Sequence, residues 1–450
     1  MNKTIKLKKG LDIKLIGKAE NNLINAIDSE TFAIQPSDFE AVLPKLMIKP
    51  GAKVKAGTVL FYNKNNPKVK FTSPVSGTVL EVKRGERRKI LKVIIEPDNE
   101  NLYENFNLKD KISDYHRKEI VDLLLSSGLW PMIMQRPYAI IANPDDIPKS
   151  IFISGFDSAP LGVDYEFILK DRKKDFFTGI QVLQKLSTNI NLNVDGTKPI
   201  SDVYNIQNVK INKFIGKHPA GTIGTQINHI DPLNKGEKIW YVNPQDVAII
   251  GKFFLTGKLD LTKIVALAGS EVAEPKYYKT KIGSQIKSII NENLKTKENI
   301  RIISGNVLTG TKTYCKGYLG FYDSLISVIP EGNYYEFLGW GMLGLKKFSM
   351  SRAFFSWLTP NKQYKLDTNY HGGERAFVMS EQYDKVVPMD ILPQQLLRAC
   401  IVEDIDKMEQ LGIYEVAEED FALCDFVCTS KIEVQEIIRK GINLMIKEIG

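Results

Sequence analysis

Side chains that could carry redox or metal chemistry are few in this sequence. Its 450 residues include four cysteines and four histidines. Cys424 and Cys428 lie in the stretch ALCDFVCTSK with Cys400 nearby, whereas Cys315 stands far upstream. An iron–sulfur cluster takes four thiolates, so three neighbouring thiols predict no such site. We expect these three cysteines to be small, buried core residues.

The nearest candidate for a phosphate cradle is HPAGTIGTQINH, residues 218–229. Gly221 and Gly224 would let a backbone approach a ligand closely, and His218 and His229 could donate hydrogen bonds. The stretch matches neither GxGxxG nor GxxxxGK[ST], so an irregular loop is an equal alternative. The histidines are too scattered to predict a metal centre, and the serine motif GxSxG is absent.

Residues 45–95 resemble a biotinyl or lipoyl barrel-sandwich domain, with turn glycines, short alternating strands and the phrase SPVSGTV. In those domains the modified lysine stands a fixed number of residues before this serine. The count back from Ser73 reaches Asn66, and Lys64 and Lys68 are both out of register. We therefore expect a rigid module that carries no lipoyl or biotinyl group.

Composition describes an ordinary globular chain with a basic excess. Hydrophobic residues make up 43%, charged residues 25%, and the formal net charge is +8. Blocks such as KRGERRK fit solvated faces, but they would also attract an anionic membrane surface or an acidic partner. No nucleic-acid-binding motif is recognisable. Without a membrane-spanning apolar stretch or a signal peptide, we expect the cytoplasm or the cytoplasmic face of a membrane.

The order of the predicted elements divides the chain into five regions. We predict a barrel-sandwich-like β domain, a Rossmann-like α/β domain, a small β-grasp (SLBB-like) module, a β-rich connection and a helical domain. In the same order they cover residues 1–100, 101–257, 258–330, 331–380 and 381–450. The alternation of strands and helices in the second region indicates a mainly parallel sheet.

Individual elements carry recognisable end signals. The stretch RKEIVDLLLSSG predicts a helix that ends at Gly128, and NPQDVAIIGKFFLTG predicts one between Asn243 as N-cap and Gly257. In the connection, the aromatic stretch NYYEFLGW at residues 333–340 is interpreted as a strand.

Several long motifs follow one another in a fixed order: KKGLDIKLIGKAE, NNPKVKFTSPVSGTVLEVKRGERR, SSGLWPMIMQRPY, KHPAGTIGTQINHIDPL, VNPQDVAIIGKFFLTGKL, RIISGNVLTGTK and ALCDFVCTSK. Together they resemble, over essentially the full length, the A subunit of the bacterial Na⁺-translocating NADH:quinone reductases. That family is similar to the FMN-binding subunit of complex I and the C subunit of the Rnf complex. Where those relatives have a glycine-rich FMN loop, this chain has Trp130, Met132, Ile133 and Met134. Side chains of that size would block a flavin phosphate, so the FMN and NADH sites are inferred to be lost.

The resemblance implies a peripheral subunit on the cytoplasmic face of the bacterial inner membrane, inactive by itself. It implies no redox cofactor on this chain, with FMN, FAD, iron–sulfur and NADH sites on other subunits. The membrane-embedded B subunit is the implied partner and quinone the implied substrate, with quinone reduction coupled to Na⁺ export. For quinone contact we predict Trp130, Arg136 and His218. The alternatives are packing roles for Trp130 and Arg136, a structural adaptor without a ligand, or a flavin-dependent oxidoreductase.

Two expectations concern stability. If the Arg136 guanidinium faces a cleft, its loss should leave stability almost unchanged. The C-terminal helical region is expected to bind the membrane partner. A chain ending near residue 380 should keep the preceding domains folded, because each has its own core.

Overall fold

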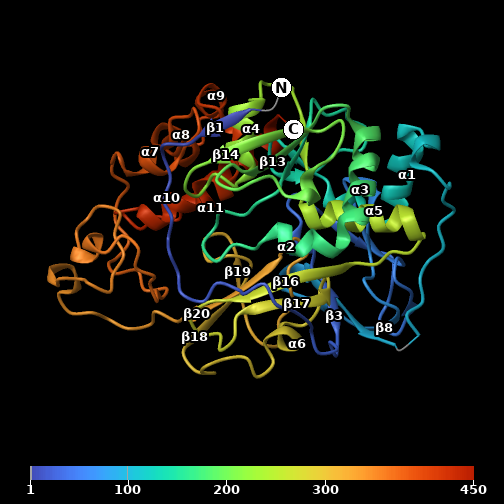
Figure 1. Cartoon of the computed structure of the whole chain (residues 1–450), viewed down its shortest axis with the longest axis horizontal. Helices are drawn as coiled ribbons and strands as arrows, with labels where there is room; N and C mark the ends of the chain where they lie inside the picture. Colours follow the sequence, from blue (N-terminus) through green and yellow to red (C-terminus); the bar gives the residue numbers. More distant parts are fainter. Residues whose placement is uncertain (1–2, 99, 450) are drawn as a thin grey trace.

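The structure is a computed structural model that describes residues 3–98 and 100–449. The strands of this part of the chain form four sheets. Figure 1 shows the β-grasp strands in yellow at the bottom, with the α/β sheet and the red C-terminal helices above them.

A seven-stranded sheet forms the centre of the α/β domain, in the order β1-β14-β13-β12-β15-β10-β11. The strands are β1 (Thr4–Lys6), β10 (Met134–Arg136), β11 (Ile140–Ile141), β12 (Ile151–Ser154), β13 (Ile190–Asp195), β14 (Lys210–Ile215) and β15 (Ile239–Tyr241). The first five strands in the sheet order run parallel, and at one edge β10 pairs antiparallel with both β15 and β11. The chain leaves β12 toward β13 on one side and later returns to β15 on the other. This is the doubly wound arrangement.

Helices cover both faces of this sheet, and successive residues of β12 pack on opposite sides. Ile151 and Ile153 of β12 face a core shared with α3 (Lys173–Leu186) and α5 (Pro244–Thr256). Phe152 faces α4 (Ile223–Ile230) on the opposite side. Where α3 and α5 cross, a Cβ atom on Gly251 would lie 1.8 Å from the Asp175 carbonyl oxygen, so only glycine permits this approach.

The helix ends predicted from sequence are confirmed. Helix α1 (Arg117–Ser127) stops at Gly128, whose φ of 76° is left-handed. At the start of α5 the Asn243 side chain accepts the Gln245 N–H, and Gly257 ends the helix with φ of 68°. A short helix, α2 (Tyr165–Leu169), precedes α3.

The strands formed by the first hundred residues belong to four different sheets. Strand β1 joins the α/β sheet, and β2 (Leu23–Asn25) pairs with the β-grasp sheet. The other strands form the small sheets β3-β9-β8-β5 and β4-β6-β7. They are β3 (Phe32–Ile34), β4 (Pro44–Leu46), β5 (Lys53–Val54), β6 (Val59–Asn63), β7 (Asn66–Thr72), β8 (Gly77–Arg84) and β9 (Ile90–Pro97).

The barrel-sandwich hairpin is formed by β6 and β7. Its two turn residues are Lys64 and Asn65, so Lys64 lies at the tip, two positions before the residue that the sequence count gives. Lys68 forms an ion pair with Asp145 at 2.8 Å. The absence of a lipoyl or biotinyl group stays a prediction.

The β-grasp module is a six-stranded sheet in the order β19-β18-β20-β16-β17-β2. It contains β16 (Thr262–Ala268), β17 (Lys276–Lys281), α6 (Ile286–Ile290), β18 (Ile300–Ser304), β19 (Thr311–Thr313) and β20 (Leu325–Pro330). The β16–β17 hairpin followed by α6 matches the predicted β-β-α order.

The predicted β-rich connection is wrong for residues 331–380. Their described backbone contains two 3-10 turns, Gly339–Gly341 and Phe355–Leu358, and one isolated bridge, from Tyr364 to Leu15, but no strand. The run beginning at Asn333 is rich in aromatic residues, as strands often are, yet in the described structure no strand pairs with it. Tyr335 and Phe337 are exposed instead of packed, so the pattern has no core to face.

The C-terminal region is helical, as predicted. It contains α7 (Gln382–Val386), α8 (Pro393–Ile401), α9 (Ile405–Gln410), α10 (Ala422–Val427) and α11 (Val434–Glu448). Its helices share a separate hydrophobic core that includes Cys400, Cys424 and Cys428. Every helix in the described part of the chain is too short or too polar to span a bilayer.

Candidate functional site

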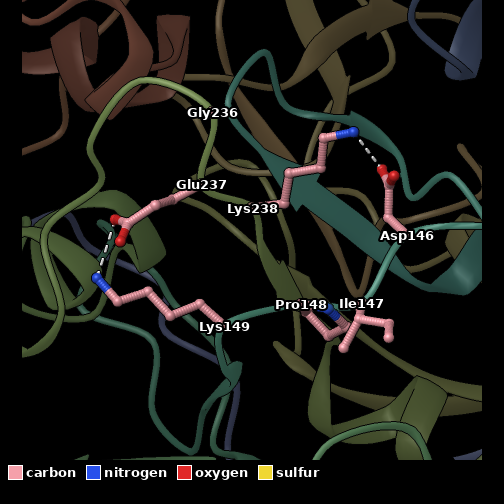
Figure 2. Close-up of a pocket in the computed structure, with 7 residues that line it drawn as sticks. All are labelled: Asp146, Ile147, Pro148, Lys149, Gly236, Glu237 and Lys238. Carbon is pink, nitrogen blue, oxygen red and sulfur yellow. Dashed lines mark hydrogen bonds and ion pairs between the residues drawn. The ribbon is translucent and has the colours of Figure 1, made fainter.

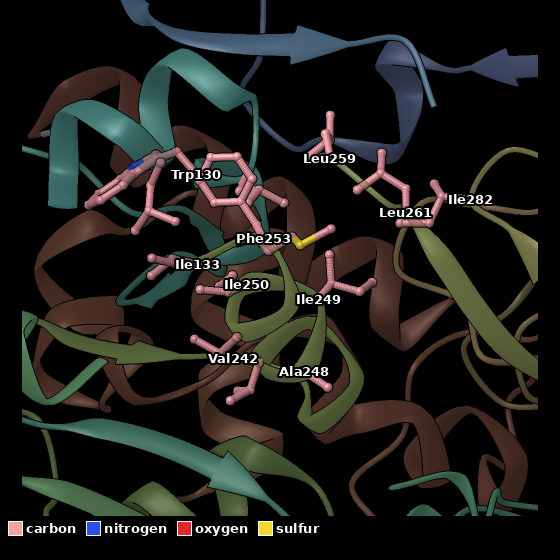
Figure 3. Close-up of a cluster of buried hydrophobic side chains, with 14 of the residues drawn as sticks. Trp130, Ile133, Val242, Ala248, Ile249, Ile250, Phe253, Leu259, Leu261 and Ile282 are labelled. Atoms are coloured by element: carbon pink, nitrogen blue, oxygen red, sulfur yellow. The ribbon is translucent and has the colours of Figure 1, made fainter. Parts of the chain in front are cut away.

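Trp130 fills the interior of the α/β domain. It begins a 3-10 turn, Trp130–Met132, directly after α1, and its side chain is fully buried. The indole ring stands edge-to-face against Trp240, with centroids 5.5 Å apart, and its N–H donates to the Ala142 carbonyl at 2.7 Å. Figure 3 shows Trp130 near Ile133, above Ile250 and Val242. The segment that stands where the relatives have a flavin loop is therefore part of the packed interior.

Arg136 is buried in an ion-pair cluster that joins two regions of the chain. Its guanidinium, at the end of β10, contacts Asp420 at 2.9 Å and Glu419 at 2.7 Å. It also lies 5.9 Å from the centre of the Tyr241 ring. The Arg136 and Asp420 side chains are both fully buried. The expectation that Arg136 faces a cleft is wrong, because its donors point at carboxylates of the C-terminal region.

Asp420 also contacts the glycine-rich loop. A Cβ atom on Gly224, in the first turn of α4, would lie 2.3 Å from both carboxylate oxygens of Asp420. One of these oxygens accepts the Ala417 N–H at 2.8 Å. Burial raises the pKa of Asp420, and the charge of Arg136 opposes that shift. The close approach that Gly224 allows is thus taken by a carboxylate of the same chain.

His218 lies against the loop that follows β12. Its Nδ1 is 3.0 Å from the Ser158 hydroxyl oxygen, which also accepts the Gly221 N–H at 2.8 Å. The His218 backbone N–H donates to Asp12 at 2.9 Å. The side chain is 7% exposed, and burial lowers the pKa of His218 to about 4, so the imidazole is neutral at pH 7.

A pocket of about 280 Å³ opens beside Ser158. It lies where residues 12–18, which follow β1, pass the loop after β12 and residue Gln363 of the connection between the β-grasp module and the C-terminal helices. Its lining residues are Asp12, Ile13, Lys14, Leu15, Lys18, Ser158, Ala159, Pro160, Leu161 and Gln363. Ser158 connects it to His218, whereas neither Trp130 nor Arg136 lines it. It combines an apolar wall with a hydroxyl and two ammonium groups, a composition suited to a small carbonyl-bearing ligand.

A larger hollow of about 450 Å³ lies at the opposite ends of the parallel strands, next to the first residues of β12 and β15 (Figure 2). Lys149 binds Glu237 at 2.9 Å and Asp231 at 2.8 Å, and Lys238 pairs with Asp146. Because each of these charged groups already has an ion-pair partner, the hollow offers a ligand little unpaired charge.

The thiols do not form a metal site. Within residues 3–98 and 100–449, no group of three or more histidine, cysteine or acidic side chains is placed to hold a metal ion. Cys400, Cys424 and Cys428 are buried in the C-terminal core, and the Tyr383 hydroxyl donates to the Cys428 sulfur at 3.0 Å. Burial raises the pKa of Cys400 to about 12, which keeps it a neutral thiol.

Family models match three parts of the chain. The NqrA N-terminal barrel-sandwich hybrid domain matches residues 5–98, the NqrA second alpha/beta domain residues 115–259, and the NQRA C-terminal domain residues 264–314. The A subunit of the Na(+)-translocating NADH-quinone reductase of Rhodopirellula baltica is 38% identical over 98% of both chains. That of Saccharophagus degradans is 37% identical over 99% of this chain and all of its own.

This chain belongs to the family of A subunits of the Na⁺-translocating NADH-quinone reductases. It is thus one component of a multi-subunit NADH-quinone reductase. The barrel-sandwich, α/β and SLBB architecture predicted from sequence is confirmed.

The residues that complete the buried sites of this A subunit were not predicted from its sequence. Asp420 and Glu419 pair with Arg136 from more than 280 positions away. Ser158 lies in ISGFDSAP, a stretch without the spacing of a nucleophile motif. Gly224 was the one usable signal, since a glycine in a helical first turn indicates a close neighbour but does not name it.

The buried neutral state of His218 makes the protein sensitive to mild acid. The unfolded chain binds a proton at His218 below its ordinary pKa of about 6.5, whereas the folded chain resists protonation until about pH 4. This contribution to stability is therefore present above pH 6.5 and lost as the pH falls toward 4. The linkage predicts a loss of about 2 kcal/mol between pH 7 and pH 5.

Urea unfolding at both pH values would measure this loss, with His218→Asn as the comparison. The asparagine amide oxygen can replace Nδ1 toward Ser158 but does not titrate. The other titrating groups are common to both proteins, so the difference between their pH profiles isolates His218. Equal profiles would contradict the prediction.

Proposed function

We propose that this A subunit binds quinone and contributes to its reduction, coupled to Na⁺ export by the assembled complex. It carries no redox cofactor of its own, so that FMN, FAD, iron–sulfur and NADH sites belong to other subunits. It attaches to the cytoplasmic face of the inner membrane through the membrane-embedded B subunit. The names of its relatives, which are subunits of an NADH-quinone reductase, support the reaction.

The packing of Trp130 is the observation that carries the cofactor part of the proposal. A flavin phosphate needs small residues and free backbone N–H groups at a loop. Here Trp130, Met132 and Ile133 are buried at the corresponding place, and the indole N–H is already bonded to Ala142. The residues present do not fit a flavin there.

The pocket beside Ser158 is the proposed quinone site. Ile13, Leu15 and Leu161 supply an apolar surface for the ring, and Lys14 can donate to a quinone carbonyl. The Ser158 oxygen accepts the Gly221 N–H, which leaves its own proton for His218 or for a ligand carbonyl. Of the three predicted residues, His218 supports this site through Ser158. Direct quinone contact by Trp130 and Arg136 stays a prediction.

The test combines spectroscopy with titration. The purified chain is expected to show no flavin absorbance, and a soluble short-chain ubiquinone should quench its tryptophan fluorescence saturably. Ser158→Ala should raise the Kd for that quinone several-fold, since it removes a donor. Lys149→Ala, in the hollow at the amino ends of β12 and β15, is the control and should leave the Kd unchanged.

Stoichiometric flavin in the purified chain would overturn the cofactor part of the proposal. A chain that assembles into the complex but gives no saturable quenching would be a structural adaptor without a ligand. An unchanged Kd for Ser158→Ala would move the quinone site elsewhere.

A further inference from the structure

The exposed apolar side chains of this protein are concentrated in one short segment. In the described part of the chain, thirty large hydrophobic residues are exposed, and ten of them lie within residues 334–358. Among the most exposed are Tyr335, Phe337, Leu343 and Leu358. Single exposed apolar residues are normal on a protein surface, but such a concentration marks an interaction site. We call residues 334–358 the exposed arm.

The arm is fixed to the body of the protein. In its middle the Phe348 ring packs against Tyr364 and Phe426, with centroids 5.5 and 5.8 Å apart. At its start the Tyr334 hydroxyl donates to Asp367 at 2.8 Å. In Figure 1 the orange connection that contains the arm projects from the molecule at the left. The arm is therefore anchored at Phe348, while the connection that contains it projects from the body of the protein.

Two runs of the arm lie side by side. The Phe355 N–H donates to the Leu343 carbonyl at 3.0 Å, which joins the first run to the second. Gly344 adopts a left-handed φ of 59° where its Cα meets the Phe354 ring, a place that a Cβ atom could not share. The Lys347 ammonium donates to the Gly339 carbonyl at 3.2 Å. These contacts join the two runs of the arm to each other.

The charges of the arm are basic. Its charged residues are Glu336, Lys346, Lys347 and Arg352. Glu336 is neutralised by an ion pair with Lys347, so the exposed Lys346 and Arg352 leave a net positive charge. The Arg352 guanidinium lies 5.9 Å from the centre of the Trp357 ring. Aromatic side chains beside basic ones are typical of protein segments that sit at the headgroup level of membranes.

We propose that the exposed arm inserts into the headgroup layer of an anionic lipid bilayer. This goes beyond attachment through a membrane subunit, because the contact is with lipid itself. Its positive charge complements anionic headgroups. No arm residue lines either pocket described above, and a bilayer accepts apolar side chains without a shaped groove. The irregular backbone of the arm suits the hydrated interface, where water can satisfy its polar groups, but not the hydrocarbon core.

Vesicle flotation of the full chain tests the proposal. Vesicles of phosphatidylcholine with a third of phosphatidylglycerol are expected to carry at least five-fold more protein than vesicles of phosphatidylcholine alone. Combining Tyr335→Ser, Phe337→Ser and Leu343→Ser should lower binding to the anionic vesicles at least five-fold. Because these side chains are exposed, circular dichroism and the melting temperature should stay unchanged.

A matched control removes three exposed apolar residues elsewhere. Leu43→Ser, Ile147→Ser and Val402→Ser together should leave vesicle binding as it is. Equal loss in both triple variants would show unspecific hydrophobic adsorption and overturn the proposal. It also fails if the unaltered chain does not bind anionic vesicles. Should the arm variant detach from the detergent-solubilised complex while its vesicle binding is unchanged, the arm is a protein interface instead.

Discussion

Replacing Arg136 by alanine is expected to destabilise the protein by about 3–5 kcal/mol, the usual cost of breaking a buried ion pair from one side. The guanidinium and the Asp420 carboxylate are fully buried, 2.9 Å apart, so the substitution leaves a buried carboxylate without its cation. That carboxylate lies directly against Gly224 of α4. Urea unfolding monitored by circular dichroism would measure the loss.

Lys68→Ala is the matched control, since it also breaks an ion pair of 2.8 Å. Its partners are more than half exposed, and such pairs contribute at most about 1 kcal/mol. A loss for Arg136→Ala as small as that for Lys68→Ala would contradict a structural role. The same reasoning bears on a chain ending near residue 380, whose folding stays a prediction. Such a chain lacks Glu419 and Asp420, so Arg136 would be left uncompensated.

Trp130→Ala is expected to cost about 3–5 kcal/mol, as large-to-small changes of buried aromatic residues do. It removes the ring that packs against Trp240 and leaves the Ala142 carbonyl without its donor. The substitution should lower the melting temperature by many degrees, which scanning calorimetry would measure. Trp357→Ala, at an exposed tryptophan of the arm, is the control and should have little effect.

Quinone titration separates the two roles considered for Trp130. If it only fills the core, the folded fraction of Trp130→Ala should bind quinone with an unchanged Kd. A variant with normal stability and several-fold weaker quinone binding would contradict the packing role and restore Trp130 as a contact residue.

Local signals in the sequence were sufficient for much of the fold. Gly128, Asn243 and Gly257 mark helix ends through backbone conformation and capping, which depend on a few neighbouring residues. The prediction for residues 333–340 was wrong because aromatic residues favour a strand only where another strand pairs with it. Whether a partner strand exists depends on the rest of the fold.

The candidate site was harder to predict than the fold. Trp130 and Arg136 were recognised as notable, but their surroundings come from distant residues such as Trp240 and Asp420. Arginine is common at cleft surfaces and also in buried ion pairs, so its type alone cannot distinguish the two. His218 was selected from a loop motif, while its partner Ser158 lies 60 positions before it in the chain.

The placement of β1 and β2 has a consequence for synthesis on the ribosome. Both strands emerge first, but their partners β14 and β17 start at Lys210 and Lys276. At roughly 5–20 residues per second, β1 waits about 10–40 s for β14, and β2 waits longer still. During that interval both N-terminal strands are unpaired. Neither large sheet can gain this outermost strand until the nascent chain has grown far past the barrel-sandwich domain.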